Sequence, residues 1–572
     1  MAGPPPHPRR ASARGRRAAP LLALAMLAVV AGAVVGARHS PQDQLVAQSF
    51  VRAWEREDYA AMHALISPGA RRRTGAARFA AAYRRVAATA TLVRVRAGRA
   101  GERRDGVVTV SMTVSTRIFG AIAGTLKLAM EDEDGAPRVD WAPHLAFPGL
   151  EPAEALRRST KLPPRADILA RDGRPLARGP DRTSALGPLG LVAGTLGPAP
   201  PEARARLFAL GLESDARIGV SGLERELEPS LRGTPGGELR AGGRLLARSA
   251  PRPAAATRAS LDVEVQQAAV QALAGRLGGV AVLRPRTGEV LALAGIAFSA
   301  PQPPGSTFKV VTLAAALEAG LVDRGSTFPA VTATRLEGVE LENADGELCG
   351  GTLAEAFAES CNSVFAPLGA QLGARRLVAA AERFGFNEAP TLQGAAPSTI
   401  PPAAEIGGDL AVGSTAIGQG RLLATPVQMA SVAATIARRG RRVRPTLLAG
   451  ASGRSTVVTS AKVARTTTRL MERVVRSGTG TAAALPGVRV AGKTGTAELR
   501  DTTRRGSEDP GTPPGEERVQ DRTDTDAWFI AFAPAQRPRV AVAVLLVGQG
   551  AGGETAAPAA RIVLQAALGR GG

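Results

Sequence analysis

The first regular pattern in the chain is a change from helical to strand periodicity within residues 41–150. Its opening half has apolar positions three and four residues apart, as in amphipathic helices, and its second half alternates apolar and polar positions, as in strands. The predicted helices are 44–54, 59–66 and 76–86. The predicted strands are 91–95, 107–114, 124–130 and 138–141. Helices followed by strands predict a compact α+β domain over residues 41–150.

Residues 151–255 are rich in Pro, Gly and Arg and show only weak periodicity. The stretch 165–177 predicts a β-hairpin, because Gly173 lies between two short apolar runs. The stretch 219–224 predicts the start of a short helix. No cluster of side chains in this segment suggests chemistry, so we interpret it as a linker, or pedestal, domain.

From about residue 256 the pattern changes to long apolar runs and well-formed amphipathic segments. Apolar runs typical of strands occur at 279–283, 289–294, 488–498, 527–534 and 540–547. Helical spacing occurs at 261–277, through much of 310–440, and at 556–568. Strands flanked by helices predict an α/β domain over 256–570.

An uncharged apolar run at 18–37 follows a cluster of arginines near the N-terminus. Its length of about 20 residues is enough to span a bilayer, and the basic flank is expected to stay in the cytoplasm. A cleaved signal peptide is the alternative, because the small residues at 31–33 and 36–37 fit a peptidase. We predict a cytoplasmic tail and transmembrane helix over 1–37, in a single-pass membrane protein whose later domains are extracytoplasmic.

The chain is strongly basic, with 72 Lys and Arg against 50 Asp and Glu and a formal net charge of +22. A nucleic-acid-binding protein is one explanation of this charge. A basic surface near anionic lipid or a cell-wall polymer is the other. We favour the second, and expect no nucleic-acid partner, because no basic stripe is interleaved with aromatic residues.

The candidate chemistry begins at Ser306. Pro303, Pro304 and Gly305 break the chain directly before a run of helix formers, so Ser306 is expected at or near a helix start. Lys309 follows three residues later on the same helical face, where its amine can reach the serine hydroxyl. Serine needs a group that takes its proton, and the four His all lie far upstream. The pattern argues against a Ser-His-Asp triad and makes Lys309 the candidate base.

Lysine and asparagine are scarce in this chain, which makes their positions informative. Only five of the basic residues are lysine, and two of these are Lys309 and Lys493. A lysine acts as a base when burial or a like-charged neighbour lowers its pKa, whereas arginine does not lose its proton. Only three asparagines are present, and one of them is Asn362, in the triplet 360–362.

Three short motifs occur in order along the predicted α/β domain. They are Ser306-Thr307-Phe308-Lys309, Ser360-Cys361-Asn362 and Lys493-Thr494-Gly495. They resemble the S-x-x-K, S-x-N and K-T-G set of penicillin-recognising serine enzymes. Each motif alone is a weak signal. Their occurrence in this order, with residues 527–529 on the strand after the third motif, is a strong signal. The chain resembles a class B penicillin-binding protein, which implies the transpeptidase fold, an antiparallel sheet flanked by helices.

The resemblance implies a role for each motif residue. Ser306 would attack a D-Ala-D-Ala carbonyl of a peptidoglycan stem peptide, with Lys309 as the base. Ser360 would relay a proton to the departing D-Ala, and Asn362 would hold the donor's amide. Lys493 would keep Lys309 partly deprotonated and attract the substrate carboxylate.

The same resemblance implies a substrate site and an activity. The substrate-binding residues would be Thr494, Gly495 and Thr496, whose two threonines bind the carboxylate. The backbone N–H groups of Ser306 and Thr496 would form the oxyanion hole. The implied enzyme is a peptidoglycan D,D-transpeptidase without metal or cofactor, which β-lactam antibiotics inhibit covalently. Its implied partners are stem peptides, β-lactams, the cytoplasmic membrane and a cell-wall glycosyltransferase.

The N-terminal part of the chain extends the resemblance. Helices followed by a curved sheet over 41–150 are similar to the cone-shaped fold of nuclear-transport-factor-like domains. Together with residues 141–150, this domain is similar to the low-affinity, resistance-type branch of class B penicillin-binding proteins. Such a domain can hold a ligand pocket or act as a spacer between the membrane and the next domain. We favour the spacer, because the fold alone does not imply a ligand.

Two other functions are compatible with the motifs. A non-catalytic penicillin-binding scaffold of a cell-wall complex would share the fold, although intact motifs favour the enzyme. A class A β-lactamase would need a water-activating carboxylate in a Glu-x-x-Leu-Asn segment, which residues 363–492 lack. We therefore expect the acyl-enzyme to persist.

Cys349 and Cys361 are the only two cysteines in the chain, and they lie twelve residues apart. An extracytoplasmic compartment permits their oxidation. A disulfide between them and a pair of buried free thiols are both compatible with the sequence.

Overall fold

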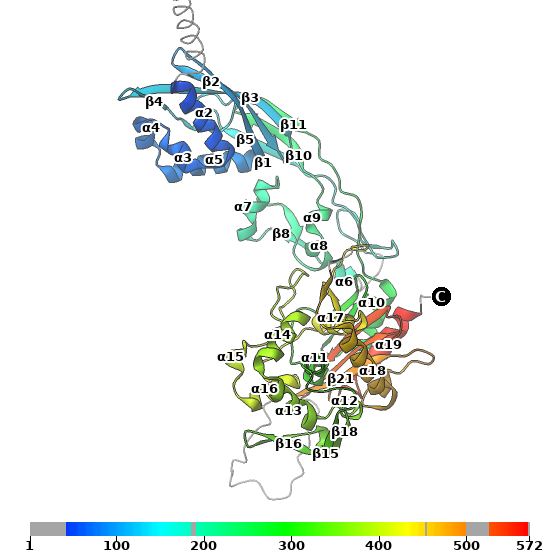
Figure 1. Cartoon of the computed structure of the whole chain (residues 1–572). Helices are drawn as coiled ribbons and strands as arrows, with labels where there is room; N and C mark the ends of the chain where they lie inside the picture. The colour runs from blue at the N-terminus through cyan, green and yellow to red at the C-terminus, as the bar shows by residue number, and fades with distance from the viewer. Residues whose placement is uncertain (1–41, 185–189, 452, 454, 499–524, 570–572) are drawn as a thin grey trace, which may run out of the picture. The chain divides into compact units, whose positions relative to one another are not determined.

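The computed structural model describes residues 42–184, 190–451, 453, 455–498 and 525–569. The predicted transmembrane helix at 18–37 lies outside these residues. Within the described ranges, no helix is both long enough and apolar enough to cross a membrane. The chain divides into two compact units (Figure 1). Unit 1 consists of Met1–Pro163, Ala199–Ala216 and Gly233–Pro253, and unit 2 of Pro164–Pro198, Arg217–Arg232 and Ala254–Gly572.

Unit 1 begins with an α+β domain, as the periodicity predicts. Its helices are α2 (Gln42–Glu55), α3 (Tyr59–Ala64), α4 (Pro68–Arg73) and α5 (Ala76–Ala90). An antiparallel sheet follows, with its strands in sequence order: β1 (Leu92–Arg104), β2 (Val107–Thr116), β3 (Gly120–Glu133) and β4 (Ala136–Val139). The predicted helices and strands are confirmed, and β1 and β3 are longer than predicted.

The periodicity does not predict α4, because this short helix contains three arginines and little apolar spacing. Capping sets its start instead: the Ser67 hydroxyl accepts a hydrogen bond from the first turn, which begins with Pro68. The core of the domain is rich in aromatic side chains. Phe79, Tyr83 and Trp141 pack together, and the indole N–H of Trp141 donates to the Tyr83 hydroxyl at 3.1 Å. The indole N–H of Trp141 therefore has a hydrogen-bond acceptor although the ring is buried.

Part of the predicted linker segment belongs to unit 1. It forms a three-stranded antiparallel sheet of β5 (Leu156–Lys161), β10 (Gly236–Ala241) and β11 (Arg244–Ser249), with β10 in the centre. Arg158 on β5 donates to the carbonyl oxygens of Ala88 and Phe208, and its guanidinium lies 4.2 Å from the centroid of the Phe208 ring. Phe208 lies on α7 (Pro201–Ala209). One arginine therefore connects three elements of unit 1.

The remaining linker residues belong to unit 2. The predicted hairpin is confirmed as the antiparallel pair β6 (Ile168–Leu169) and β7 (Pro175–Ala177), and β12 (Thr257–Arg258) pairs with β6. The predicted short helix is α8 (Gly222–Glu226). The segment 151–255 is thus shared between the two units.

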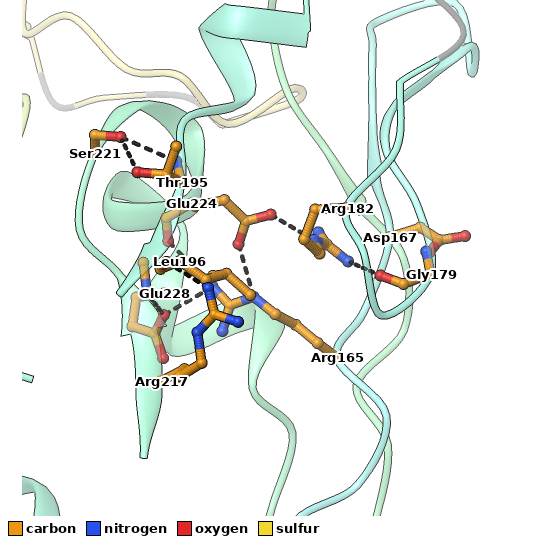
Figure 2. Close-up of polar contacts among 11 residues, drawn as sticks. Arg165, Asp167, Gly179, Arg182, Thr195, Leu196, Arg217, Ser221, Glu224 and Glu228 are labelled. Carbon is orange, nitrogen blue, oxygen red and sulfur yellow. Dashed lines mark hydrogen bonds and ion pairs between the residues drawn. The ribbon is translucent and has the colours of Figure 1, made fainter. Parts of the chain in front are cut away.

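A buried ion-pair network connects this hairpin region to α8 (Figure 2). The fully buried carboxylate of Glu224 accepts hydrogen bonds from Nε of Arg165 and from Nε of Arg182, each at 2.6 Å. Glu228 accepts from Arg165 and from the backbone N–H of Gly219, each at 2.7 Å. Removing one partner of a buried ion pair typically costs about 3–5 kcal/mol, because the other charge is left without a partner. The network therefore fixes the hairpin region and α8 together.

Unit 2 is organised around a five-stranded antiparallel sheet in the order β14-β13-β23-β22-β21. The strands are β13 (Gly278–Leu283), β14 (Val290–Gly295), β21 (Ala491–Glu498), β22 (Thr525–Ala533) and β23 (Val540–Leu546). Alternate residues of β22 enter two different hydrophobic cores, with Trp528 and Ile530 in one and Phe529 and Ala531 in the other. Both faces of the sheet are therefore covered, which confirms the predicted antiparallel sheet flanked by helices.

Helices α10 (Val263–Leu273) and α19 (Ala556–Leu568) cover one face of this sheet (Figure 1). The core on the other face includes α11 (Lys309–Glu318) and α17 (Pro426–Ala437). Further helices of this unit are α12 (Leu353–Ala358), α13 (Asn362–Leu372), α14 (Ala374–Phe384), α16 (Asp409–Ala416) and α18 (Ala461–Ser477). A segment of short paired strands precedes α12: β15 (Thr327–Val331), β16 (Ala333–Leu336), β17 (Val339–Glu342) and β18 (Cys349–Thr352).

Candidate active site

The first motif lies where a short 3-10 helix continues into α11. The 3-10 helix η3 (Gly305–Phe308) carries Ser306, and Lys309 is the first residue of α11. Glycine is required at position 305, because its φ is +51° and a Cβ there would lie 2.4 Å from the carbonyl oxygen of Thr496 on β21. This close backbone approach holds the first motif against the strand that carries the third.

The second motif forms the turn between α12 and α13. Ser360 has a φ of +64°, which is uncommon for a residue other than glycine. Cys361 forms a disulfide with Cys349 on β18, with a Cα–Cα distance of 5.5 Å. The structure thus has the first of the two cysteine arrangements that the sequence allows. Asn362 is the first residue of α13.

The third motif lies on β21, at the edge of the sheet. Lys493 and Thr494 are buried, whereas Thr496 is exposed. The Lys493 amine donates to the carbonyl oxygen of Thr494 at 3.0 Å. Because β21 has a neighbouring strand on one side only among the described residues, part of its backbone N–H groups is available to a ligand.

Two lysine amines meet at Ser360. Nζ of Lys309 donates to the Ser360 carbonyl oxygen at 2.6 Å and to Oδ1 of Asn362 at 2.7 Å, and it lies 3.3 Å from the Ser360 hydroxyl oxygen. Nζ of Lys493 lies 2.8 Å from the same hydroxyl oxygen. The structure therefore brings Lys309, Ser360, Asn362 and Lys493 into one hydrogen-bonded cluster.

Both amines are removed from water. Burial lowers the pKa of Lys309 well below its ordinary value, and the positive charge of Lys493 lowers it further. Burial lowers the pKa of Lys493 to about 7, against the opposing effect of the Glu359 carboxylate. The Lys309 and Lys493 amines each lie 5.7 Å from a ring centroid, of Phe365 and Phe357 respectively. A lysine whose pKa is lowered by burial in this way can act as a base.

Ser306, the predicted nucleophile, lies outside this cluster. It is partly exposed, and among the described residues its hydroxyl has no hydrogen-bond partner. The Lys309 amine makes its hydrogen bonds with Ser360 and Asn362, so the predicted contact with the Ser306 hydroxyl is not a hydrogen bond in this structure. Hydrogen bonds of catalytic groups are often long without substrate and shorten when it binds.

The sequence does not indicate three further side chains at this site. Phe357 and Phe365 lie beside the lysine amines and contact each other edge to face, with 5.7 Å between their centroids. Thr479 connects the end of α12, directly before the second motif, to the third motif: its N–H donates to the Ala358 carbonyl oxygen at 3.2 Å, and its hydroxyl oxygen lies 2.6 Å from that of Thr494. Two core phenylalanines and one threonine form no recognisable sequence motif, so their place at the site is visible only in the structure.

The lowered pKa of Lys493 predicts a pH-dependent contribution to stability. Between pH 7 and 10.5 the unfolded state binds a proton that the folded state does not, so the free energy of unfolding rises with pH in this window. Lys493→Met removes the titrating group, and we expect the variant to gain about 2 kcal/mol less than the wild type between pH 7 and pH 9. Denaturant unfolding of both proteins at the two pH values measures this difference. Parallel pH dependences would contradict the lowered pKa of Lys493.

Comparison with known proteins identifies two matching families. Residues 278–565, half of the chain, match the family described as the penicillin binding protein transpeptidase domain. Residues 40–154 match the family described as the NTF2-like N-terminal transpeptidase domain. The first match contains all three motifs, and the second confirms the resemblance of the N-terminal domain.

Two curated relatives carry the same name for their activity. The chain is 41% identical over 301 residues to the peptidoglycan D,D-transpeptidase PbpA of Mycobacterium tuberculosis, covering 48% of this chain and 56% of that protein. It is 28% identical over 400 residues to the peptidoglycan D,D-transpeptidase MrdA of Acinetobacter baumannii, covering 59% of each protein. The chain thus spans little more than half the length of these relatives.

Solved structures agree with the family match. The crystal structure of PBPA from Mycobacterium tuberculosis aligns with a TM-score of 0.53 and 30% identity, covering 71% of this chain and 99% of that chain. PBP2 of Pseudomonas aeruginosa, in complex with WCK 5153, aligns with a TM-score of 0.60 and 26% identity, covering 72% of this chain and 97% of that chain. Because the match spans half the chain, includes every motif and agrees with the fold, the chain belongs to the family of proteins with a penicillin binding protein transpeptidase domain.

Proposed function

We propose that the chain is a peptidoglycan D,D-transpeptidase that cross-links stem peptides through a serine acyl-enzyme. The observation that carries this proposal is the pair of buried lysine amines, of Lys309 and Lys493, that share the Ser360 hydroxyl. A serine nucleophile needs a base whose proton affinity matches neutral pH, and these amines have lowered pKa values. Ser306, partly exposed and one helical turn before Lys309, is the nucleophile.

The reaction proceeds in two halves. The Ser306 hydroxyl attacks the carbonyl of the penultimate D-Ala, and neutral Lys309 takes its proton. The oxyanion accepts hydrogen bonds from the backbone N–H groups of Ser306 and Thr496. The C–N bond to the terminal D-Ala then breaks, and the departing amine receives the proton that Lys309 took, relayed through the Ser360 hydroxyl, whose oxygen lies 3.3 Å from the Lys309 amine. In the second half, the amine of another stem peptide attacks the ester carbonyl and forms the new amide bond. Lys309 takes the proton that this amine loses and returns it to the Ser306 oxygen as the ester C–O bond breaks.

The substrate-binding groups line β21 and the start of α13. Protonated Lys493 attracts the terminal carboxylate of the donor, and the threonines of 494–496 donate hydroxyl hydrogen bonds to it. Asn362 holds the amide of the donor, because its Nδ2 carries two hydrogens and the Glu342 carbonyl oxygen accepts only one of them.

We propose the following organisation of the whole chain. Residues 1–37 form the cytoplasmic tail and transmembrane anchor, 41–150 the spacer domain, 151–255 the pedestal and 256–570 the catalytic domain, outside the cytoplasmic membrane. A cell-wall glycosyltransferase is the proposed partner, because cross-linking needs polymerised glycan strands. The NTF2-like domain supports assignment to the resistance-type branch.

A transpeptidation assay tests the activity directly. The full-length protein is incubated with a peptide donor that ends in D-Ala-D-Ala and with an acceptor amine, before and after treatment with penicillin. We expect release of D-Ala and formation of the cross-linked product, both abolished by penicillin. A protein that is labelled covalently by penicillin but forms no product would instead be the non-catalytic scaffold.

We expect the penicilloyl adduct to persist, because no Glu-x-x-Leu-Asn segment supplies a carboxylate that activates water for deacylation. Intact-mass spectrometry after mixing with penicillin follows the adduct over time, and a class A β-lactamase in the same assay serves as the control that deacylates. Loss of the adduct within seconds, with repeated release of penicilloate, would replace the transferase by a hydrolase.

A further inference from the structure

The turn that carries the second motif is not determined by its own residues. Ser360 has a left-handed φ of +64°, which by itself is unfavourable for serine. Cys361 occupies the N-cap position of α13, but its sulfur is in the disulfide and its side chain makes no capping hydrogen bond. The first N–H groups of α13 therefore need an acceptor from another part of the chain.

Asn343 supplies this acceptor from the segment before α12. Its side chain is 5% exposed, and its Oδ1 accepts from the backbone N–H of Ser363 at 2.9 Å. Its Nδ2 donates to the carbonyl oxygens of Val331 at 2.8 Å and Glu347 at 3.1 Å. One buried amide thus joins the start of α13 to two separate points of the preceding segment. Both hydrogens of the amide are used within the protein.

The residue before Asn343 contacts the motif itself. The carbonyl oxygen of Glu342 accepts from Nδ2 of Asn362 at 2.9 Å. This hydrogen bond determines the orientation of the Asn362 amide, so that Oδ1, and not Nδ2, faces the Lys309 amine at 2.7 Å. With the opposite orientation, Nδ2 would face the hydrogens of the protonated Lys309 amine, or would donate to the lone pair with which the neutral amine acts as a base. The position of the Glu342 carbonyl therefore decides whether Lys309 has an acceptor at Asn362.

We propose that Asn343 is a positioning residue of the acylation reaction. It caps α13 from another segment of the chain, and it fixes the Glu342 carbonyl that orients Asn362 toward Lys309. Asn343 touches none of the reacting atoms and acts through Asn362. This inference rests on the proposed function, because its consequence is measured as acylation of Ser306.

The test compares acylation rates by a fluorescent penicillin in the full-length protein. We expect Asn343→Ala to lower the second-order rate constant about tenfold, because α13 loses its cap and a buried N–H loses its acceptor. The matched control is Asn387→Ala, which removes another amide that joins two segments. The Asn387 side chain accepts a hydrogen bond from the Ile400 N–H and donates one to the Ile400 carbonyl oxygen, each at 3.0 Å. Asn387 contacts no motif residue. We therefore expect Asn387→Ala to change the acylation rate less than about twofold, even if it lowers the melting temperature as much as Asn343→Ala does.

A double-mutant cycle separates positioning from general destabilisation. If Asn343 acts through Asn362, then Asn343→Ala in an Asn362→Ala background lowers the rate less than about twofold, whereas independent effects multiply. If Asn343→Ala does not fold, Asn343→Asp replaces it. This variant keeps an acceptor for Ser363 N–H and loses both donors, and we expect a smaller reduction that is again absent in the Asn362→Ala background.

The outcomes distinguish the two proposals. A wild-type protein that penicillin does not label would overturn the proposed function. A labelled wild type with an Asn343→Ala variant acylated at the same rate, or with effects that multiply fully in the cycle, would overturn the role of Asn343 and leave the proposed function intact.

Discussion

Ser306→Ala is expected to abolish covalent labelling by penicillin and to leave thermal unfolding nearly unchanged. Labelling is lost because the variant has no hydroxyl to form the ester, and the neighbouring serine, Ser360, lies between two lysine amines in a role of proton transfer. Stability is kept because, among the described residues, the Ser306 hydroxyl makes no hydrogen bond that the variant would lose. Fluorescent penicillin with gel detection and a thermal unfolding scan measure the two effects.

The control for this experiment is Ser326→Ala, at a serine that contacts Asp323 and none of the three motifs. We expect this variant to be labelled like the wild type. Labelling that survives in Ser306→Ala would remove Ser306 from the mechanism, and peptide mapping of the adduct would then identify the residue that replaces it.

Lys309→Arg is expected to lower the rate of acylation by about 10²–10⁴-fold, the range typical of a lost general base. Arginine keeps its proton at every accessible pH, so it cannot accept the proton of Ser306. The wild-type rate is expected to rise with pH until Lys309 is neutral, whereas the variant keeps a low rate throughout. Stopped-flow acylation between pH 5 and pH 9 compares the two profiles.

Lys462→Arg is the matched control, because Lys462 lies exposed on α18 and contributes to no motif. We expect its rate and pH profile to equal those of the wild type. A Lys309→Arg variant that retains the wild-type rate would exclude Lys309 as the base and leave Lys493 as the remaining lysine of the cluster.

The hydrophobic pattern was enough to predict the type and order of the main elements. In the N-terminal domain, the three-residue and two-residue periodicities predicted α2, α3, α5 and the four strands of the sheet, because each element buries one side and exposes the other. The short helix α4 was not predicted, because it begins at a capping serine and a proline and has no apolar stripe. The linker segment was predicted as one domain, but the structure shares it between two units, because its strands pair over long sequence distances.

The sequence also indicated the three motifs, since scarce lysines and asparagines stood out in a chain that otherwise uses arginine. Which atoms of these motifs meet follows from the folded arrangement of the chain. From helical spacing, Lys309 was expected beside Ser306, but its amine contacts Ser360 and Asn362, 51 and 53 residues away in sequence. The pairing of Cys349 with Cys361, open in the sequence, likewise follows from the fold. Local periodicity specifies which side of an element is buried, whereas hydrogen-bond partners and lowered pKa values depend on what packs against it.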